Sequence, residues 1–214
     1  MGRSRSCCGE VLRELRRVAD IPIAESLKHA HPVVTATLEA AQGWGRTQDQ
    51  RLAPRPEPGL VEARVARESL DRALRIMQTL IDACSTSGME VAALQRARTH
   101  RAGVGFGRVP HLTAIRIEEV RYRMPFAELD LEQWRNENVV WDSDEDRLRT
   151  QGWIPRASGR LRLRLPRRHD RPPRGETGWR FSFTDQVGRP LEAQLSDVLA
   201  ALDDRSRDAA DAAG

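Results

Sequence analysis

The sequence predicts an α+β fold that combines a small mixed or antiparallel sheet with a long central helix and a C-terminal helix. Apolar residues at three- and four-residue steps over 70–84 indicate the central helix. The sheet is indicated by residues 160–165 and 179–183, where apolar and polar residues alternate as in strands with one buried face. A second helical pattern, which follows Pro190, indicates the C-terminal helix.

The chain begins with a predicted N-terminal helical segment, residues 1–42. Helical spacing of apolar residues within 9–19 and Pro32 at the start of Pro32–Ala41 favour two helices there, because the first helical position needs no N–H partner. Residues 43–59 are rich in Gly and Pro, which predicts an exposed linker. We expect an α+β domain over 60–203 and a frayed tail over 204–214, where the apolar pattern is lost.

The central helix has recognisable ends. Ser69 is a suitable N-cap, and Gly88 suits the left-handed residue that ends many helices. Leu60–Val65 and Met89–Ala93 on either side are predicted to be short strands. A strand, a helix and a strand in this order predict a parallel pair joined by a right-handed crossover. The apolar stripe consists of Leu70, Ala73, Leu74, Met77, Leu80, Ile81 and Cys84.

The middle of the chain gives weaker patterns. Residues 95–110 are predicted to be a loop, because arginines are followed by the glycine-rich stretch 103–107. Beyond it, apolar residues change from odd positions near Ile117 to even positions near Tyr122, which indicates a bulge or a tight reversal between two strands. Phe126–Asn138 is predicted to be a helix and the acidic stretch after it a loop.

Two strands and a helix are predicted near the C-terminus. Residues 160–165 place leucines on one face and arginines on the other, and residues 179–183 alternate aromatic with polar side chains. Both patterns are typical of antiparallel strands with one solvated face, here joined by a long loop rich in Arg and Pro. The helix after Pro190 is predicted to turn inward Leu191, Leu195, Val198, Leu199 and Leu202.

The strongest functional signal is a local basic run. Residues 160–174 contain seven Arg and one Asp, a net charge of +6, whereas the whole chain has a net charge of +4. Arginines on the strand would stand ~6.6 Å apart on one face, and each guanidinium can hold a phosphate through two N–H groups. We therefore predict contact with a DNA or RNA backbone through Arg160, Arg162, Arg164, Arg167, Arg168, Arg171 and Arg174.

A structural interpretation of the same run stays open. An exposed strand face must be polar, and most charge runs are solvated faces. Residues 130–146 contain seven acids and one Arg, a net charge of −6, so the two segments would neutralise each other if they paired within the fold. Single-strand binding needs exposed rings, and the aromatic face of residues 179–183 is expected to belong to the core.

No pattern for catalysis, a metal or a cofactor meets its requirements. Asp142–Asp146 begins like a calcium loop, but Arg147 stands where glycine is needed. The glycines of 103–107 follow no predicted strand and open no helix, unlike those of phosphate-binding loops. We therefore predict no catalytic residue, no metal site and no cofactor. The spacing of a zinc finger is not matched by Cys7, Cys8, His29 and His31.

Cysteine usage and hydropathy bear on the compartment. Three Cys form an odd and poorly spaced set, which indicates a reducing, cytoplasmic compartment rather than a disulfide framework. No apolar stretch has transmembrane length and no signal-peptide pattern occurs, so no membrane partner is expected. Met1–Ser6 fits the N-myristoylation pattern beside Cys7 and Cys8, and the sequence does not decide whether this end is ever lipidated.

Two sets of segments, taken together, resemble those of a known protein family. The first set is Ile21–Glu25, His31–Thr37, Val61–Val65 and Ser69–Met77, and the second is Ser158–Leu163, Trp179–Arg180 and Leu191–Leu195. Together, over about residues 20–200, they resemble a family of uncharacterised bacterial proteins encoded on plasmids and integrated elements. The resemblance implies a DNA-associated role, chiefly through a helix-turn-helix-like segment of fuller members that this chain is expected to lack.

Three functional hypotheses follow. The first is a non-enzymatic accessory protein of a bacterial mobile element that contacts the nucleic-acid backbone without base specificity. The second is a protein-interaction or homo-oligomerisation module that uses the helix at 70–84 or the helix at 191–202 as its contact. The third is an enzyme whose polar cluster the sequence does not reveal. Pairing of Arg160–Arg174 with the acids of 130–146 would argue against the first, and an exposed apolar helix face would support the second.

Overall fold

The computed structural model describes residues 21–95, 102–108, 111–128, 147, 149–166 and 179–211, and it confirms the predicted α+β class. Its strands form two sheets. The mixed four-stranded sheet has the order β1–β5–β6–β7, formed by Glu62–Arg64, Arg116–Pro125, Trp153–Pro166 and Trp179–Thr184. The antiparallel three-stranded sheet has the order β2–β3–β4, formed by Glu90–Leu94, Gly103–Arg108 and His111–Ala114.

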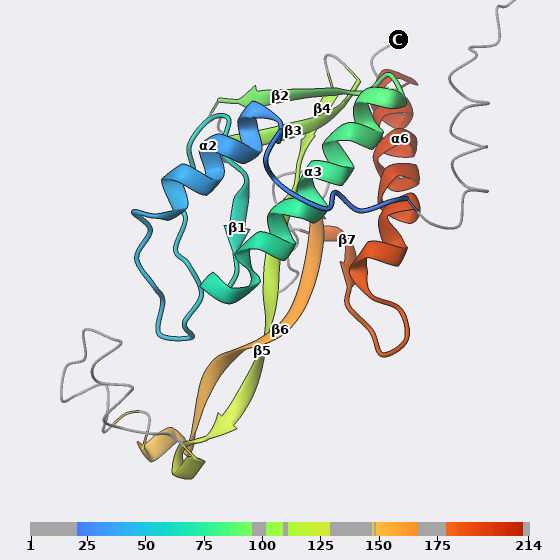
Figure 1. Cartoon of the computed structure of the whole chain (residues 1–214). Helices are drawn as coiled ribbons and strands as arrows, with labels where there is room; N and C mark the ends of the chain where they lie inside the picture. The colour runs from blue at the N-terminus through green and yellow to red at the C-terminus, as the bar shows by residue number, and fades with distance from the viewer. Residues whose placement is uncertain are drawn as a thin grey trace, which may run out of the picture.

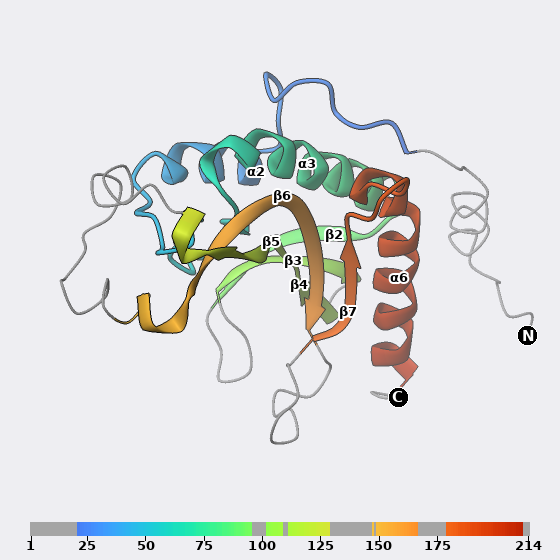
Figure 2. The ribbon, with the colours of Figure 1, turned by 90° about the horizontal axis from the view of Figure 1, so that it is seen from below.

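Helices cover one side of this arrangement. They are α2 (Pro32–Ala41), α3 (Leu70–Thr86) and α6 (Leu195–Asp211). Figures 1 and 2 show α2 and α3 across one face of the curved four-stranded sheet and α6 beside β7. Apolar side chains from these helices and from both sheets form one core, which includes Val34, Leu74, Phe106, Leu163 and Leu199.

The first two described helices follow the predicted pattern. Helix α2 spans the predicted range, and the His31 imidazole accepts a hydrogen bond from the Val33 N–H at 3.3 Å. Helix α3 begins after Ser69 and ends before Gly88, which has the predicted left-handed conformation at φ 68°. The Ser69 side chain makes no capping hydrogen bond, because a 3₁₀ turn (Arg67–Ser69) leads into the helix. Every residue of the predicted apolar stripe is buried.

The closing helix is longer than predicted. After the 3₁₀ turn η3 (Leu191–Gln194), α6 continues to Asp211 although the apolar pattern ends near Asp203. Polar contacts with β3 hold the later turns: Asp203 lies 3.2 Å from the guanidinium of Arg108, and the Ser206 hydroxyl accepts the Arg108 N–H at 3.3 Å. The expected frayed tail is therefore helical over its first part, because a distant strand supplies partners that the local pattern does not show.

Two predictions about the region after β1 are wrong. The strand–helix–strand unit is not a crossover within one sheet, because β1 pairs with β5 in parallel whereas β2 pairs with β3 in the other sheet. The glycine-rich stretch predicted to be a loop is strand β3. At Gly105, an added Cβ would come within 2.7 Å of Leu94 and 2.9 Å of Leu112. The glycines thus permit close packing of neighbouring strands rather than a turn.

The segment at 43–59 is not uniformly exposed. Leu52 is 1% exposed and belongs to the core, and Pro54 is also buried. The Leu52 N–H donates to the carbonyl of Val65 at 2.8 Å, which holds this segment against the end of β1. Residues 55–58 are exposed, in keeping with a surface connection.

A bulge explains the change of parity in β5. The strand is continuous, so the bulge is correct and the predicted alternative of a tight reversal is wrong. Between Glu119 and Arg121 one residue of β5 faces three residues of β6, among them Gly159 at φ 75°. The buried carboxylate of Glu119 accepts the N–H of Gly159 and, at 2.8 Å, that of Ala66. The bulge is thereby tied to the end of β1.

Beyond the bulge, Arg121–Pro125 and Trp153–Ala157 leave the body of the fold as a two-stranded antiparallel ribbon, which we call the arm (Figure 1). Apolar residues change parity because β5 leaves the main core here: Ile117 faces that core, whereas Met124 on the opposite face pairs with Ile154. Of the predicted helix after β5, only the 3₁₀ turn Phe126–Glu128 is described. The predicted helix at 9–19, the rest of this one and the acidic loop lie outside the described residues.

Candidate nucleic-acid interface

The structure describes three of the seven arginines predicted to bind nucleic acid, Arg160, Arg162 and Arg164, and all three lie on β6. Because they alternate with the buried Leu161 and Leu163, Arg162 and Arg164 stand on the outer face of the sheet, opposite the core. This placement agrees with the predicted strand face. The other predicted residues, which lie outside the described ranges, are Arg167, Arg168, Arg171 and Arg174.

Arg162 and Arg164 share an acid from the neighbouring strand. Oε1 of Glu118 lies 2.7 Å from Nε of Arg164 and 3.8 Å from Nη1 of Arg162. The two arginine side chains are only 21% and 27% exposed. Burial lowers the pKa of Arg164, Glu118 opposes this, and Arg162 lowers the pKa further. Arg162 also donates to the Thr184 hydroxyl at 3.1 Å, so these side chains join three strands.

The alternation of charge continues to the β1 edge of the sheet. Arg116 on β5 lies opposite Glu62 on β1, and their charged groups are 2.8 Å apart. Arg64 contacts the same carboxylate at 3.0 Å. Opposite charges on facing strands stabilise a sheet. With Glu118, Arg162 and Arg164 included, this outer face carries four arginines and two acids, a net charge of +2.

Arg160 lies in the bulge at the base of the arm, and its side chain is exposed. Nε and Nη2 of Arg160 donate to the backbone carbonyl of Asp185 at 3.2 and 2.7 Å. A carbonyl oxygen orients the guanidinium without neutralising its charge. Arg160 is therefore held in place but remains a cation toward the solvent.

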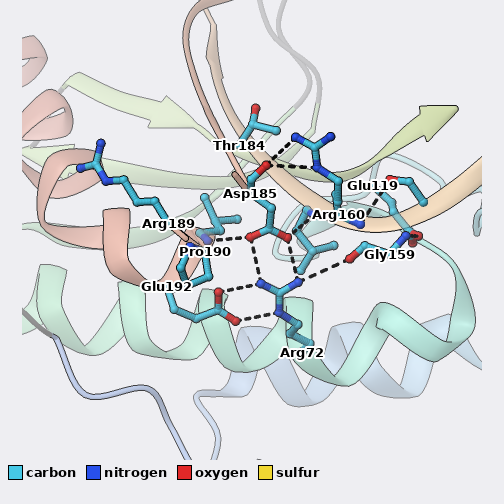
Figure 3. A network of polar contacts seen from close by, with 12 residues as sticks. Arg72, Glu119, Gly159, Arg160, Thr184, Asp185, Arg189, Pro190 and Glu192 are labelled. Atoms are coloured by element: carbon cyan, nitrogen blue, oxygen red, sulfur yellow. Dashed lines mark hydrogen bonds and ion pairs between the residues drawn. The ribbon is translucent and has the colours of Figure 1, made fainter. Parts of the chain in front are cut away.

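The Asp185 carboxylate belongs to a closed polar network (Figure 3). It accepts two hydrogen bonds from Arg72, at 2.8 and 2.9 Å, and one each from the N–H groups of Leu161 and Leu191, at 2.7 and 2.6 Å. Arg72 also donates to both oxygens of Glu192. Burial raises the pKa of Asp185, but these hydrogen bonds outweigh burial and lower it. The network holds α3 to β6 and η3, and each oxygen of the Asp185 carboxylate accepts two hydrogen bonds.

The arm carries three arginines that the sequence pattern does not single out. The side chain of Arg121 is 58% exposed. Arg123 is also exposed, and its guanidinium lies 4.5 Å from the centre of the Trp153 ring. In the part of the chain that the structure describes, no carboxylate lies within ion-pair distance of Arg123 or Arg156. The change of parity after Ile117 was the one sequence signal for this ribbon.

The loop before β1 braces the base of the arm. The buried carboxylate of Asp49 accepts Nε and Nη2 of Arg51 at 3.1 and 2.9 Å and lies 3.6 Å from Nη1 of Arg121. Burial raises the pKa of Asp49, but hydrogen bonds from Arg51 and Thr47 outweigh burial and lower it. Arg51 also donates to the carbonyl of Glu119 at 3.1 Å. One acid thus serves two arginines at the base of the arm.

Among the described residues, no three His, Cys, Asp or Glu side chains are placed to hold a metal ion. The same residues include no helix with the length and apolar character needed to cross a membrane. Burial raises the pKa of the Cys84 thiol to about 12, so this cysteine is a packing residue of α3.

Comparison with known proteins adds no residue to this interface. No protein-family model, curated protein or solved structure matches the chain. The interface is therefore defined by the geometry and charge of this chain alone.

Proposed function

We propose that this chain is a non-enzymatic accessory protein that contacts the backbone of nucleic acid with arginines at the junction of the arm and the sheet. The observation that carries the proposal is that, among the described residues, Arg123, Arg156 and Arg160 face no carboxylate, and Arg121 shares Asp49 with Arg51. Within the described residues, the one carboxylate at ion-pair distance from any of them is Asp49, which Arg51 already neutralises. Guanidinium groups in this state are suited to paired hydrogen bonds with phosphate oxygens.

The proposed interface and the basic run predicted from the sequence share only part of their arginines. Arg162 and Arg164 are partly buried against Glu118, so they add to the positive potential of the outer face more than to direct phosphate contact. Arg160 is the described residue that belongs both to the run and to the junction. The interface is thus centred on the bulge rather than on the strand face.

A role on a bacterial mobile element is part of this proposal. It rests on the expected resemblance of about residues 20–200 to proteins encoded on plasmids and integrated elements. Phosphate contacts position a protein without reading sequence, which suits an accessory role beside a sequence-reading partner.

The alternative of a protein-interaction module has less support. The helices it would use pack their apolar faces into the chain's own core: Leu74 and Met77 on α3 and Val198 and Leu199 on α6 are all buried. Among the described residues, the large apolar side chains that are exposed belong to three different elements and form no continuous patch. They are Leu38, Tyr122 and Val187.

Salt dependence of DNA affinity tests the proposal. Affinity for a duplex of about 30 base pairs is measured by fluorescence anisotropy from about 50 to 300 mM KCl. Each lost phosphate contact should make the slope of log affinity against log salt shallower by about 0.9, so four should change it by about three to four. The variant that removes the junction charges is R121Q/R123Q/R156Q/R160Q.

A charge-matched control separates a local site from overall charge. The control variant removes four arginines on other elements and should keep the wild-type slope. Absence of DNA binding by the wild type at low salt, or the same slope for both variants, contradicts the proposal. The control variant is R55Q/R75Q/R189Q/R207Q.

A further inference from the structure

We infer that the arm lies in the major groove of double-stranded DNA, with the face that carries Arg121 and Arg123 toward the bases. This inference rests on the proposed function. It adds the class of nucleic acid, B-form duplex DNA, and the surface of the arm that enters it.

The two faces of the arm differ in what covers them. Residues directly opposite each other in the ribbon share a face, so Tyr122 and Met124 lie on one face with Arg156 and Ile154. Ile154 is 0% exposed, so the outer end of this face is covered. We call the other face the open face, since Arg121, Arg123 and Pro125 on it are exposed. The open face consists of Arg121, Arg123, Pro125, Trp153, Pro155 and Ala157.

The open face carries two exposed arginines opposite smaller side chains. Arg121 and Arg123 on β5 lie opposite the smaller side chains of Ala157 and Pro155 on β6, and both arginines are exposed. The guanidinium of Arg123 packs over the ring of Trp153, which restricts its motion before any ligand binds. A partner of high negative charge therefore meets two exposed guanidinium groups, one of them held over the Trp153 ring.

The dimensions of the arm suit the major groove of B-form DNA. Its five residue pairs give a length of about 17 Å at ~3.4 Å per residue. The major groove is about 12 Å wide and admits a two-stranded ribbon, whereas the minor groove is about 6 Å wide. The major groove of A-form RNA is deep and too narrow for side chains to read. Duplex DNA is therefore the fitting substrate.

Single-stranded nucleic acid fits the open face less well. Binding of single strands relies on bases that stack on exposed aromatic rings. The ring of Trp153 is already covered by Arg123, and Tyr122 lies on the opposite face. Phe183 on β7 packs against the core. The open face thus offers charge and hydrogen-bond donors without a free ring.

The base of the arm is fixed to the body, which lets the arm act as a preformed element. The buried carboxylate of Glu119 holds backbone N–H groups of Gly159 and Ala66. Arg51 links Glu119 to Asp49, and Asp49 in turn faces Arg121. Preorganisation reduces the entropy lost on binding.

The test compares three nucleic acids and two charge-matched variants. Wild type is expected to bind duplex DNA more tightly than single-stranded DNA or double-stranded RNA of the same sequence. R121Q/R123Q should weaken duplex binding about 50-fold at about 100 mM salt, because two positive charges that release counterions from the duplex are lost, whereas R75Q/R207Q should change it by less than about threefold. Guanine N7, which faces the major groove, should be protected from dimethyl sulfate by wild type and not by R121Q/R123Q.

The outcomes separate this inference from the proposed function. If wild type binds DNA but leaves guanine N7 reactive, or binds single strands as tightly as duplex, the groove placement is overturned and backbone contact stands. If wild type binds no DNA, both are overturned. The R121K/R123K variant keeps both charges and should retain most of the affinity, which excludes misfolding as the cause of a loss in R121Q/R123Q.

Discussion

In the body of the sheet and in the arm, the same two strands carry arginines at alternate positions, yet the surroundings of those arginines differ. In the body, Arg162 and Arg164 flank Glu118 and are about one quarter exposed. In the arm, Arg121 is 58% exposed, and Arg123 has no described acid beside it. The body half has β1 and β7 on its edges, whereas the arm has no third strand among the described residues.

This difference follows from desolvation. A guanidinium that is largely buried must be paired, because an uncompensated charge removed from water is costly. Glu118 and Glu62 meet this requirement in the body. A guanidinium in water has no such requirement and gains little from an ion pair. The body arginines are therefore expected to act on stability, and the arm arginines on binding.

The largest effect is expected at Asp185, a buried acid of the body whose carboxylate accepts four hydrogen bonds. In Asp185→Asn, an amide group faces the N–H of Leu161 or Leu191 and the charge opposite Arg72 is lost. We expect the free energy of unfolding, measured in urea, to fall by about 3 kcal/mol. Asp197→Asn removes the exposed acid beside Arg189 and should cost less than about 1 kcal/mol. Similar costs for the two variants would contradict the structural role of the network.

A smaller loss is expected for Glu118→Gln, which leaves Arg162 and Arg164 without their shared acid. The free energy of unfolding should fall by about 2 kcal/mol, because both guanidinium groups are partly desolvated. Glu68→Gln makes the same chemical change at an exposed acid and should stay within about 0.5 kcal/mol of wild type. If the two variants have the same free energy of unfolding, the ion pairs of Glu118 do not stabilise the fold. The difference between the arginines of the body and those of the arm is then contradicted.

Acid titration should affect the body in a defined direction. The pKa values of Asp185 and Asp49 are lowered from their ordinary value of 3.8. The folded state thus binds fewer protons than the unfolded state below that pH, so the stability from these groups is present above pH 3.8 and is lost as pH falls through the folded pKa values. Asp185→Asn should flatten this acid limb of the stability profile, and Arg123→Gln should leave it unchanged. A profile that Asp185→Asn does not alter would count against the network.

The smallest effect on stability is expected in the arm. Arg123→Gln and Arg156→Gln should each change the free energy of unfolding by less than about 0.5 kcal/mol, because both side chains lack a described ion pair. Urea denaturation beside the DNA titration shows whether stability and binding separate in these variants. A loss above about 1 kcal/mol would mean that the arm arginines are structural, as in the body.

The helices were the most predictable elements. Pro32–Ala41 and the stripe from Leu70 to Cys84 follow a local period that burial on one face imposes, so their ranges could be predicted. Strand β3 and the membership of β1 and β2 in different sheets could not, because strand pairing depends on residues far apart in the chain. The one sequence signal for the arm was the shift of apolar residues from odd to even positions after Ile117. A tight reversal between two strands explained that shift equally well.

Part of the candidate site was also predictable from the sequence, and part was not. The strand face of Arg160, Arg162 and Arg164 was predictable, because alternation with leucine orients side chains by the geometry of the strand itself. Their pairing was not, because Glu118 precedes Arg162 by more than forty residues. A charge run therefore shows where cations are concentrated along the chain, and it does not show which of them remain unpaired.

By itself, the sequence determined that Pro32–Ala41 and the stripe from Leu70 to Cys84 are helical, that the β6 face of Arg162 and Arg164 is polar and where positive charge is densest, since these depend on neighbours within a few residues. Only the tertiary structure decided that the body arginines are paired with acids on neighbouring strands and that Arg121 and Arg123 are exposed on a projecting ribbon. The physical reason is that ion pairing and desolvation act over a few ångströms in space. Those distances are set when distant strands pair, not by position along the chain.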